Sequence, residues 1–241
     1  MAAIEQRGIL LVYPLANRPE PRSLWSELHP RTPMRWAWDA SADGRVAQLW
    51  RLREELARSL DVVYAKWFRG RATFFSRPVF QEMLAALSHA AGGDLRAGLS
   101  RQASLLLDLL EDDSPQSTKQ LRAAADLQGR ANEAIYARSL KELWARLLVV
   151  GVGEVDDGAF PSLNMSATRH RFEDLWPGAS AESELPEQAA LQAALDAAPL
   201  FARELRRTIS ALEAFCAFAA SKRERDAERD SASSRPHRPR E

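Results

Sequence analysis

Two basic side chains three residues apart form the pattern in this sequence with the clearest potential chemistry. Arg138 and Lys141 lie in a stretch, residues 130–147, whose apolar residues recur at helical spacing, and both point away from that apolar stripe. Cations on an exposed helix face can contact DNA phosphates or base edges, and Arg130 at the start of the stretch is a third candidate. The same stretch also contains two acidic residues, Glu133 and Glu142. A solvated helix face is therefore the competing interpretation.

A second group of cations surrounds Gly70. Lys66, Arg69 and Arg71 are interleaved with aromatic residues, and the apolar runs on either side predict a hairpin of two strands. A basic hairpin tip with accessible aromatic rings suits phosphate binding and base stacking. An ordinary hairpin with core aromatics and solvated arginines is the alternative, and we slightly favour it.

The elements that must position the first group follow one another in an informative order. Helical segments are expected from residue 100, from residue 118 and over 130–147. The periodicity then changes to a strand at 148–152, a turn at 153–158 and a returning strand at 160–165. Three helices followed by a two-stranded ribbon predict a winged helix-turn-helix.

The turn of this ribbon is acidic. Glu154, Asp156 and Asp157 would approach phosphates in the usual docking of a winged helix, and like charges repel. Two possibilities follow: the ribbon, which is the wing of such a fold, is held away from a duplex, or the winged helix-turn-helix binds protein.

The fold class predicted for the whole chain is α+β and mainly helical. Residues 1–97 are expected to form a small mixed α/β unit and residues 98–178 the winged helix-turn-helix. Residues 183–220 are expected to form C-terminal helices broken at Pro199. The charged stretch 221–241 has no apolar anchors, so we expect it to be disordered.

Composition limits the partners. The 241 residues contain 33 Lys and Arg against 33 Asp and Glu, so any attraction to DNA must come from a local basic patch. The single cysteine, Cys216, excludes an internal disulfide and is expected to pack inertly. No apolar stretch approaches the length of a membrane span, so we expect a cytoplasmic protein without a membrane partner.

The sequence shows no catalytic constellation. The four histidines are widely spaced and lack metal-ligand spacing, and no glycine-rich loop could cradle a phosphate. We therefore expect neither a metal nor a cofactor. Asp39 and Asp43 could serve as general bases, but nothing in the sequence positions them.

Two stretches carry a family resemblance. Residues 7–28 contain an apolar strand that leads into a loop and a Ser-Leu-Trp, and residues 104–155 contain the helices and ribbon described above. Together they resemble the winged-helix DNA glycosylases of the AlkZ/YcaQ type, which repair crosslinks, and their shorter relatives. The resemblance implies DNA binding and repair of alkylated or crosslinked bases by glycosidic-bond hydrolysis.

The chain departs from that family at the catalytic motif. The resemblance implies Gln-X-Gln or Gln-X-Asp at the end of the apolar strand, but the matching residues here are Tyr13, Pro14 and Leu15. No amide or carboxylate is present to orient water, so the activity is not carried over. Three hypotheses follow: a DNA-binding relative without the standard chemistry, a protein-interaction module, and a glycosylase with displaced catalytic residues such as Asp39 or Asp43.

Overall fold

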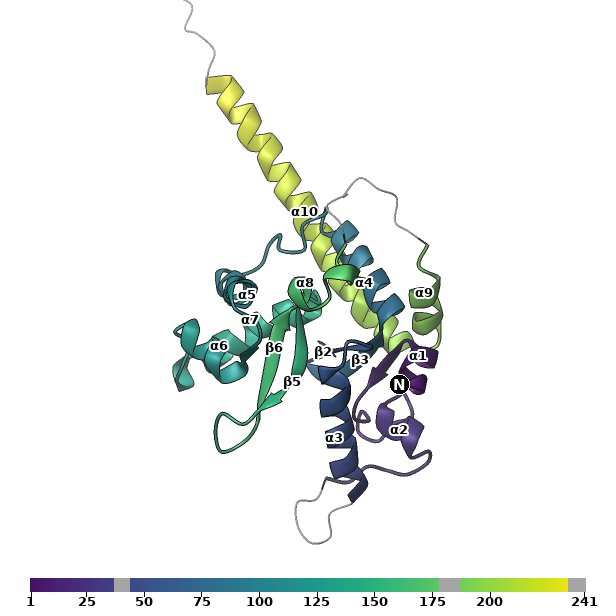
Figure 1. Ribbon diagram of the computed structural model, residues 1–241. Coiled ribbons are helices and arrows are strands. Elements are labelled where there is room, and N and C mark those ends of the chain that lie inside the picture. The colour runs from purple at the N-terminus through teal and green to yellow at the C-terminus, as the bar shows by residue number, and fades with distance from the viewer. Residues whose placement is uncertain (37–43, 178–186, 234–241) are drawn as a thin grey trace, which may run out of the picture.

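The computed structural model describes residues 1–36, 44–177 and 187–233, and it shows an α+β chain with two small antiparallel sheets (Figure 1). The elements of the first half are α1 (Ala2–Arg7), β1 (Ile9–Leu11), α2 (Leu24–Leu28), α3 (Gly44–Arg58), β2 (Val62–Phe68), β3 (Arg71–Ser76), α4 (Arg77–Ala90) and α5 (Arg101–Asp112). Those of the second half are β4 (Gln116–Ser117), α6 (Thr118–Ala124), the 3-10 helix η1 (Arg130–Asn132), α7 (Glu133–Ala145), β5 (Val149–Val155), β6 (Ser162–Ala167), α8 (Thr168–Arg171), the 3-10 helix η2 (Glu173–Leu175), α9 (Ala189–Asp196) and α10 (Pro199–Ser233).

The first sheet has the strand order β1-β3-β2. β1 is buried along its whole length, as its continuous apolar run predicts, and Ile9 pairs with Phe75 of β3. Strands β2 and β3 form the predicted hairpin, whose turn places Arg69 and Gly70 at positive φ. Two positive φ values suit a tight turn that follows the twist of its strands. α4 packs against this hairpin, and α9 and α10 pack against α4.

The second sheet has the strand order β4-β6-β5 and follows three helices. The order expected from periodicity is present, since α5, α6 and α7 precede the β5–β6 hairpin. Sequence patterning did not find β4, because two residues are too few to show a period. Ser117 caps α6: its hydroxyl accepts a hydrogen bond from the Gln120 amide at 3.1 Å.

The two sheets approach each other closely through one glycine. A Cβ placed on Gly151 of β5 would lie 2.3 Å from the Tyr64 ring of β2, so only glycine allows this approach. α3 packs against both β2 and β5, and the buried residues of the two sheets belong to one hydrophobic cluster. A boundary between independent units at residues 97 and 98 remains a prediction.

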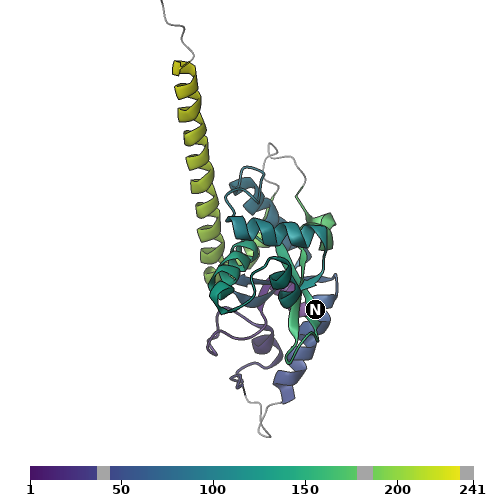
Figure 2. The same ribbon diagram turned by 90° about the vertical axis from the view of Figure 1, so that its left-hand side faces the viewer.

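The C-terminal region departs from expectation. The break at Pro199 is confirmed, because α9 ends at Asp196 and α10 begins at Pro199. α10 continues to Ser233, so residues 221–233 are helical where the sequence predicted disorder, and residues 234–241 lie outside the described part of the chain. The far half of this helix projects beyond the rest of the molecule (Figures 1 and 2).

None of the described helices is long and apolar enough to cross a membrane.

Candidate nucleic-acid interface

α7 and the turn before it present the three cations that the sequence singled out. Arg138 and Lys141 are exposed on α7, and Arg130 is exposed in η1. Within residues 1–36, 44–177 and 187–233, none of the three forms an ion pair. Their charges are therefore available to a ligand in solution.

The acidic residues of the same segment are already engaged. Both Glu133 carboxylate oxygens accept hydrogen bonds from the Arg122 guanidinium, at 2.7 and 3.2 Å. Glu142 accepts a hydrogen bond from the Ser100 amide at 2.9 Å, at the start of α5. The Glu133 charge is therefore paired with Arg122, whereas Glu142 keeps its negative charge on the same helix as Arg138 and Lys141, so a solvated helix face remains the competing interpretation.

The buried face of α7 includes Tyr136, Leu143 and Trp144. Ile135, an apolar residue of the same stretch, is 40% exposed, whereas the Tyr136 hydroxyl donates to the Thr118 carbonyl oxygen at 2.9 Å. A tyrosine can bury its ring where its hydroxyl finds a partner.

Arg146, also a basic residue of this segment, has a structural role. It donates to the carbonyl oxygens of Leu95 and Ala97 at 3.0 and 2.6 Å, and so ties the end of α7 to the loop before α5. Burial lowers the pKa of its guanidinium, while Glu142 and Asp94 act in the opposite direction. Its charge does not belong to the candidate interface.

The acids at the β5–β6 turn are mostly turned inward, which corrects the expectation that all three meet DNA. Asp157 accepts hydrogen bonds from the Ser117 and Ser162 hydroxyls at 2.5 Å each, and these bonds lower the pKa of its carboxyl. Glu154 binds Arg53 and is only 12% exposed at its side chain. Asp156 is the exposed acid of the turn.

Arg53 and its partners form a buried polar cluster that sequence reasoning missed. The Arg53 Nη2 atom lies 2.5 Å from Glu154 Oε1 and 3.0 Å from Glu54 Oε1, and its guanidinium stands over the Trp50 ring at 4.3 Å. The Glu154 amide donates to Glu54 Oε2 at 3.0 Å. One signal was available, since residue 53 falls on the inward stripe of α3 between Leu49 and Leu56.

The cations around Gly70 are less available than those of α7. Lys66 is half-buried, and burial together with the nearby Arg53 lowers its pKa. Arg69 lies over the Phe68 ring at 5.1 Å and 3.7 Å from Glu204 of α10, while Arg71 is exposed. The interleaved aromatic side chains are all buried: Trp67, Phe68, Phe74 and Phe75. Buried rings cannot stack on bases, which supports the ordinary hairpin that the sequence slightly favoured; DNA contact by Lys66, Arg69 and Arg71 stays a prediction.

The position that matches the family motif holds no hydrolytic group. Tyr13 follows β1, and its hydroxyl is buried without a hydrogen-bond partner among the described residues. Burial raises the pKa of Tyr13 to about 12, against the opposing effect of Arg53. A neutral phenol in this environment cannot accept a proton from water near neutral pH.

The remaining candidates for chemistry are few. The described residues hold no group of three or more His, Cys, Asp or Glu side chains that could bind a metal ion. Asp39 and Asp43, the proposed displaced bases, lie outside the described residues.

Comparison with known proteins gives one result. The family model described as AlkZ related matches residues 1–209. No curated protein and no solved structure gives a significant match. Since the matched region covers most of the 241 residues, the chain belongs to the AlkZ-related family.

Proposed function

We propose that this protein binds duplex DNA through α7 and the β5–β6 hairpin, in a DNA-repair setting shared with its glycosylase relatives. In this proposal residues 98–178 act as a winged helix-turn-helix, with α7 as the recognition helix and the hairpin as the wing. Arg130, Arg138 and Lys141 contact the duplex.

The strand order of the second sheet supports this assignment. The short strand β4, which follows α5, pairs with β6. β6 also pairs with β5, the strand that follows α7. This arrangement is typical of winged helices and leaves one face of the third helix uncovered. On α7 that face carries Arg138 and Lys141.

The distribution of charge is the observation that carries the proposal. Three exposed cations lack an ion pair in the described chain, while Glu133 of the same helix is paired with Arg122 and Glu154 of the hairpin is paired with Arg53. A net-neutral protein can bind DNA through such a local excess of positive charge. The proposal does not include glycosidic-bond hydrolysis, because Tyr13 and Leu15 replace the groups that this reaction needs.

The test compares two double variants with the wild type in a gel mobility shift on a short duplex at low salt. Arg138→Ala with Lys141→Ala removes two charges from the proposed interface and should weaken binding about 10-fold or more. Arg51→Ala with Lys222→Ala removes two exposed charges elsewhere and should leave binding nearly unchanged. Failure of the wild type to bind would overturn the proposal, and so would equal losses in both variants.

A further inference from the structure

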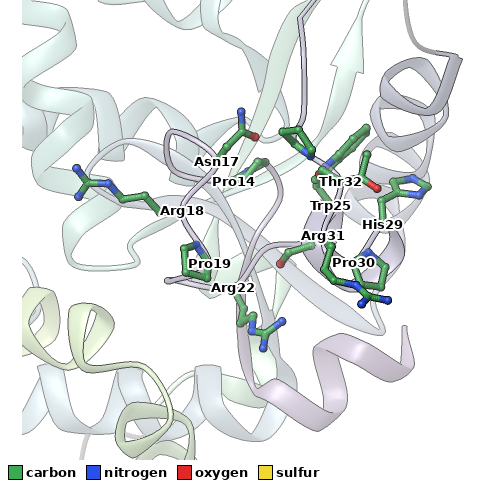
Figure 3. A pocket seen from close by; sticks show the side chains of 12 residues that line it. Pro14, Asn17, Arg18, Pro19, Arg22, Trp25, His29, Pro30, Arg31 and Thr32 are labelled. Atoms are coloured by element: carbon green, nitrogen blue, oxygen red, sulfur yellow. The ribbon is translucent and has the colours of Figure 1, made fainter.

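A pocket lies between the loop after β1 and the loop after α2 (Figure 3). Its volume is about 420 Å³, within the range of small-molecule sites. Among the described residues that line it, none is acidic. Prolines and an aromatic side chain form much of the lining: Pro14, Pro19, Pro30, Pro33 and Trp25.

Side-chain hydrogen bonds hold the two walls of this pocket together. Asn17 donates to the Met34 carbonyl oxygen at 3.0 Å and accepts from the Met34 amide at 2.7 Å, so one side chain joins the two loops twice. The indole nitrogen of Trp25 donates to the Thr32 carbonyl oxygen at 2.7 Å. Walls fixed in this way are pre-organised, which lowers the entropic cost of binding a ligand.

The backbone at the pocket is also strained. Asn17 and Arg31, which line it, and Ala16 beside it adopt φ values of 55°, 60° and 50°. Non-glycine residues adopt this left-handed region uncommonly, and such residues cluster at ligand sites. Three of them around one pocket indicate that the shape of the loops is maintained against a conformational cost.

The charges at the pocket are positive. Figure 3 shows Arg18 at one edge, Arg31 and His29 at the other, and Arg22 between them. Arg22 is paired with two carboxylates, Glu20 at 3.2 Å and Glu27 at 4.0 Å. Arg18 and Arg31 are exposed and have no ion pair within the described ranges.

We propose that this pocket binds the phosphate monoester of a nucleotide. Arg18 and Arg31 lie at opposite edges of the pocket (Figure 3), so a phosphate at either edge meets one exposed planar guanidinium, a group that suits bidentate recognition of phosphate oxygens. The proline-lined part offers an apolar surface for the attached nucleoside. Two ligands carry such a phosphate monoester: a free mononucleotide and the 5′-phosphate end of a DNA strand. This site is separate from α7 and does not depend on the proposed function.

Calorimetric titration of the full chain tests the proposal with four probes: thymidine 5′-monophosphate, thymidine, and a short single strand with and without a 5′-phosphate. The phosphorylated probes should bind more tightly than their unphosphorylated counterparts. Tighter binding of the free monophosphate identifies a mononucleotide site, and tighter binding of the phosphorylated strand identifies a strand-end site. Equal affinity with and without phosphate in both pairs, or no binding at all, overturns the proposal.

Variants locate the site. One of the variants Arg18→Gln and Arg31→Asn, the one at the edge that holds the phosphate, should weaken binding of the phosphorylated probes at least several-fold. Asparagine is chosen at residue 31 because it tolerates positive φ. Arg51→Gln is the control and should bind as the wild type does. Arg138→Ala with Lys141→Ala should retain this binding, so failure of the α7 proposal and failure of the pocket proposal are distinguishable. Unchanged affinity in both pocket variants, with unaltered thermal unfolding, would contradict the assignment.

Discussion

Arg53 of α3 binds Glu154 of β5, with Nη2 and Oε1 2.5 Å apart, and so joins the N-terminal part of the chain to the proposed wing. Arg58, one turn further along α3, reinforces the connection by donating to the Glu154 carbonyl oxygen at 3.1 Å. The acid that seemed from sequence to oppose DNA binding therefore fixes the direction of the hairpin.

Replacement of Arg53 should be strongly destabilising. Arg53→Met leaves the Glu54 and Glu154 carboxylates close together without their buried cation, and removal of one partner from such a pair costs about 3–5 kcal/mol of unfolding free energy. Arg53 is 6% exposed, so solvent cannot replace it. Urea unfolding measures the change.

The matched control for this experiment lies on the same helix. Arg51 is exposed, and Arg51→Met should change the unfolding free energy by no more than about 0.5 kcal/mol. If the two variants have similar stability, the buried pair does not stabilise the junction.

A methyl group at Gly151 should separate the two sheets. Its Cβ would overlap the buried Tyr64 ring, and overpacking of this kind costs about 1–3 kcal/mol. Gly158→Ala is the control, because its Cβ would meet nothing closer than Lys119 Nζ at 3.6 Å. In thermal unfolding, Gly151→Ala should have a lower midpoint than the wild type, and Gly158→Ala should have the same midpoint as the wild type. Equal midpoints would argue against the close contact between β2 and β5.

Removal of the Tyr13 hydroxyl should be harmless or stabilising near neutral pH. The group is buried without a partner in the described structure, and an unsatisfied buried polar atom costs about 1–3 kcal/mol. The pKa of Tyr13 rises from 10.0 to about 12 on folding, so the folded state retains the proton. The resulting contribution to stability is complete below pH 10 and is lost as the pH rises toward 12.

Denaturation of Tyr13→Phe and wild type across that alkaline range checks both points. The variant should lose less stability than the wild type as the pH rises. A clear loss of stability of the variant at neutral pH would show that the hydroxyl has a partner in solution.

Phe160, near the turn of the β5–β6 hairpin, should matter for DNA and not for the fold. Its side chain is 84% exposed, so Phe160→Ala should change stability by less than about 0.5 kcal/mol. Stacking on a base is worth about 1–3 kcal/mol, so DNA affinity should fall about 5-fold or more. Leu60→Ala removes another exposed apolar side chain, outside α7 and the β5–β6 hairpin, and should leave affinity unchanged. Unaltered DNA affinity of Phe160→Ala would place this residue outside the interface.

The helices and the hairpins were predictable because their information is local. The apolar spacing of α5 and α7 and the change of period after residue 147 depend on neighbouring residues alone. The Arg53 cluster was not predictable in the same way, since Glu54 and Glu154 are 100 residues apart and periodicity does not report such pairs.

The loop pocket was hidden for a different reason. Its shape depends on left-handed φ values at Ala16 and Arg31, which neither residue type favours. Its walls meet because Asn17 reaches Met34, a contact within irregular structure that leaves no repeating pattern. The length of α10 was missed because the sequence beyond residue 220 lacks the apolar anchors that predict a helix.

The salt dependence of DNA affinity tests the central claim most directly. The logarithm of the association constant falls with the logarithm of salt concentration by about 0.9 per phosphate contacted. If α7 is the recognition helix, Arg138→Ala with Lys141→Ala should reduce the magnitude of that slope by about 1.8, whereas Arg51→Ala with Lys222→Ala should leave it unchanged. The same slope in all three proteins would show that DNA does not contact this face of α7.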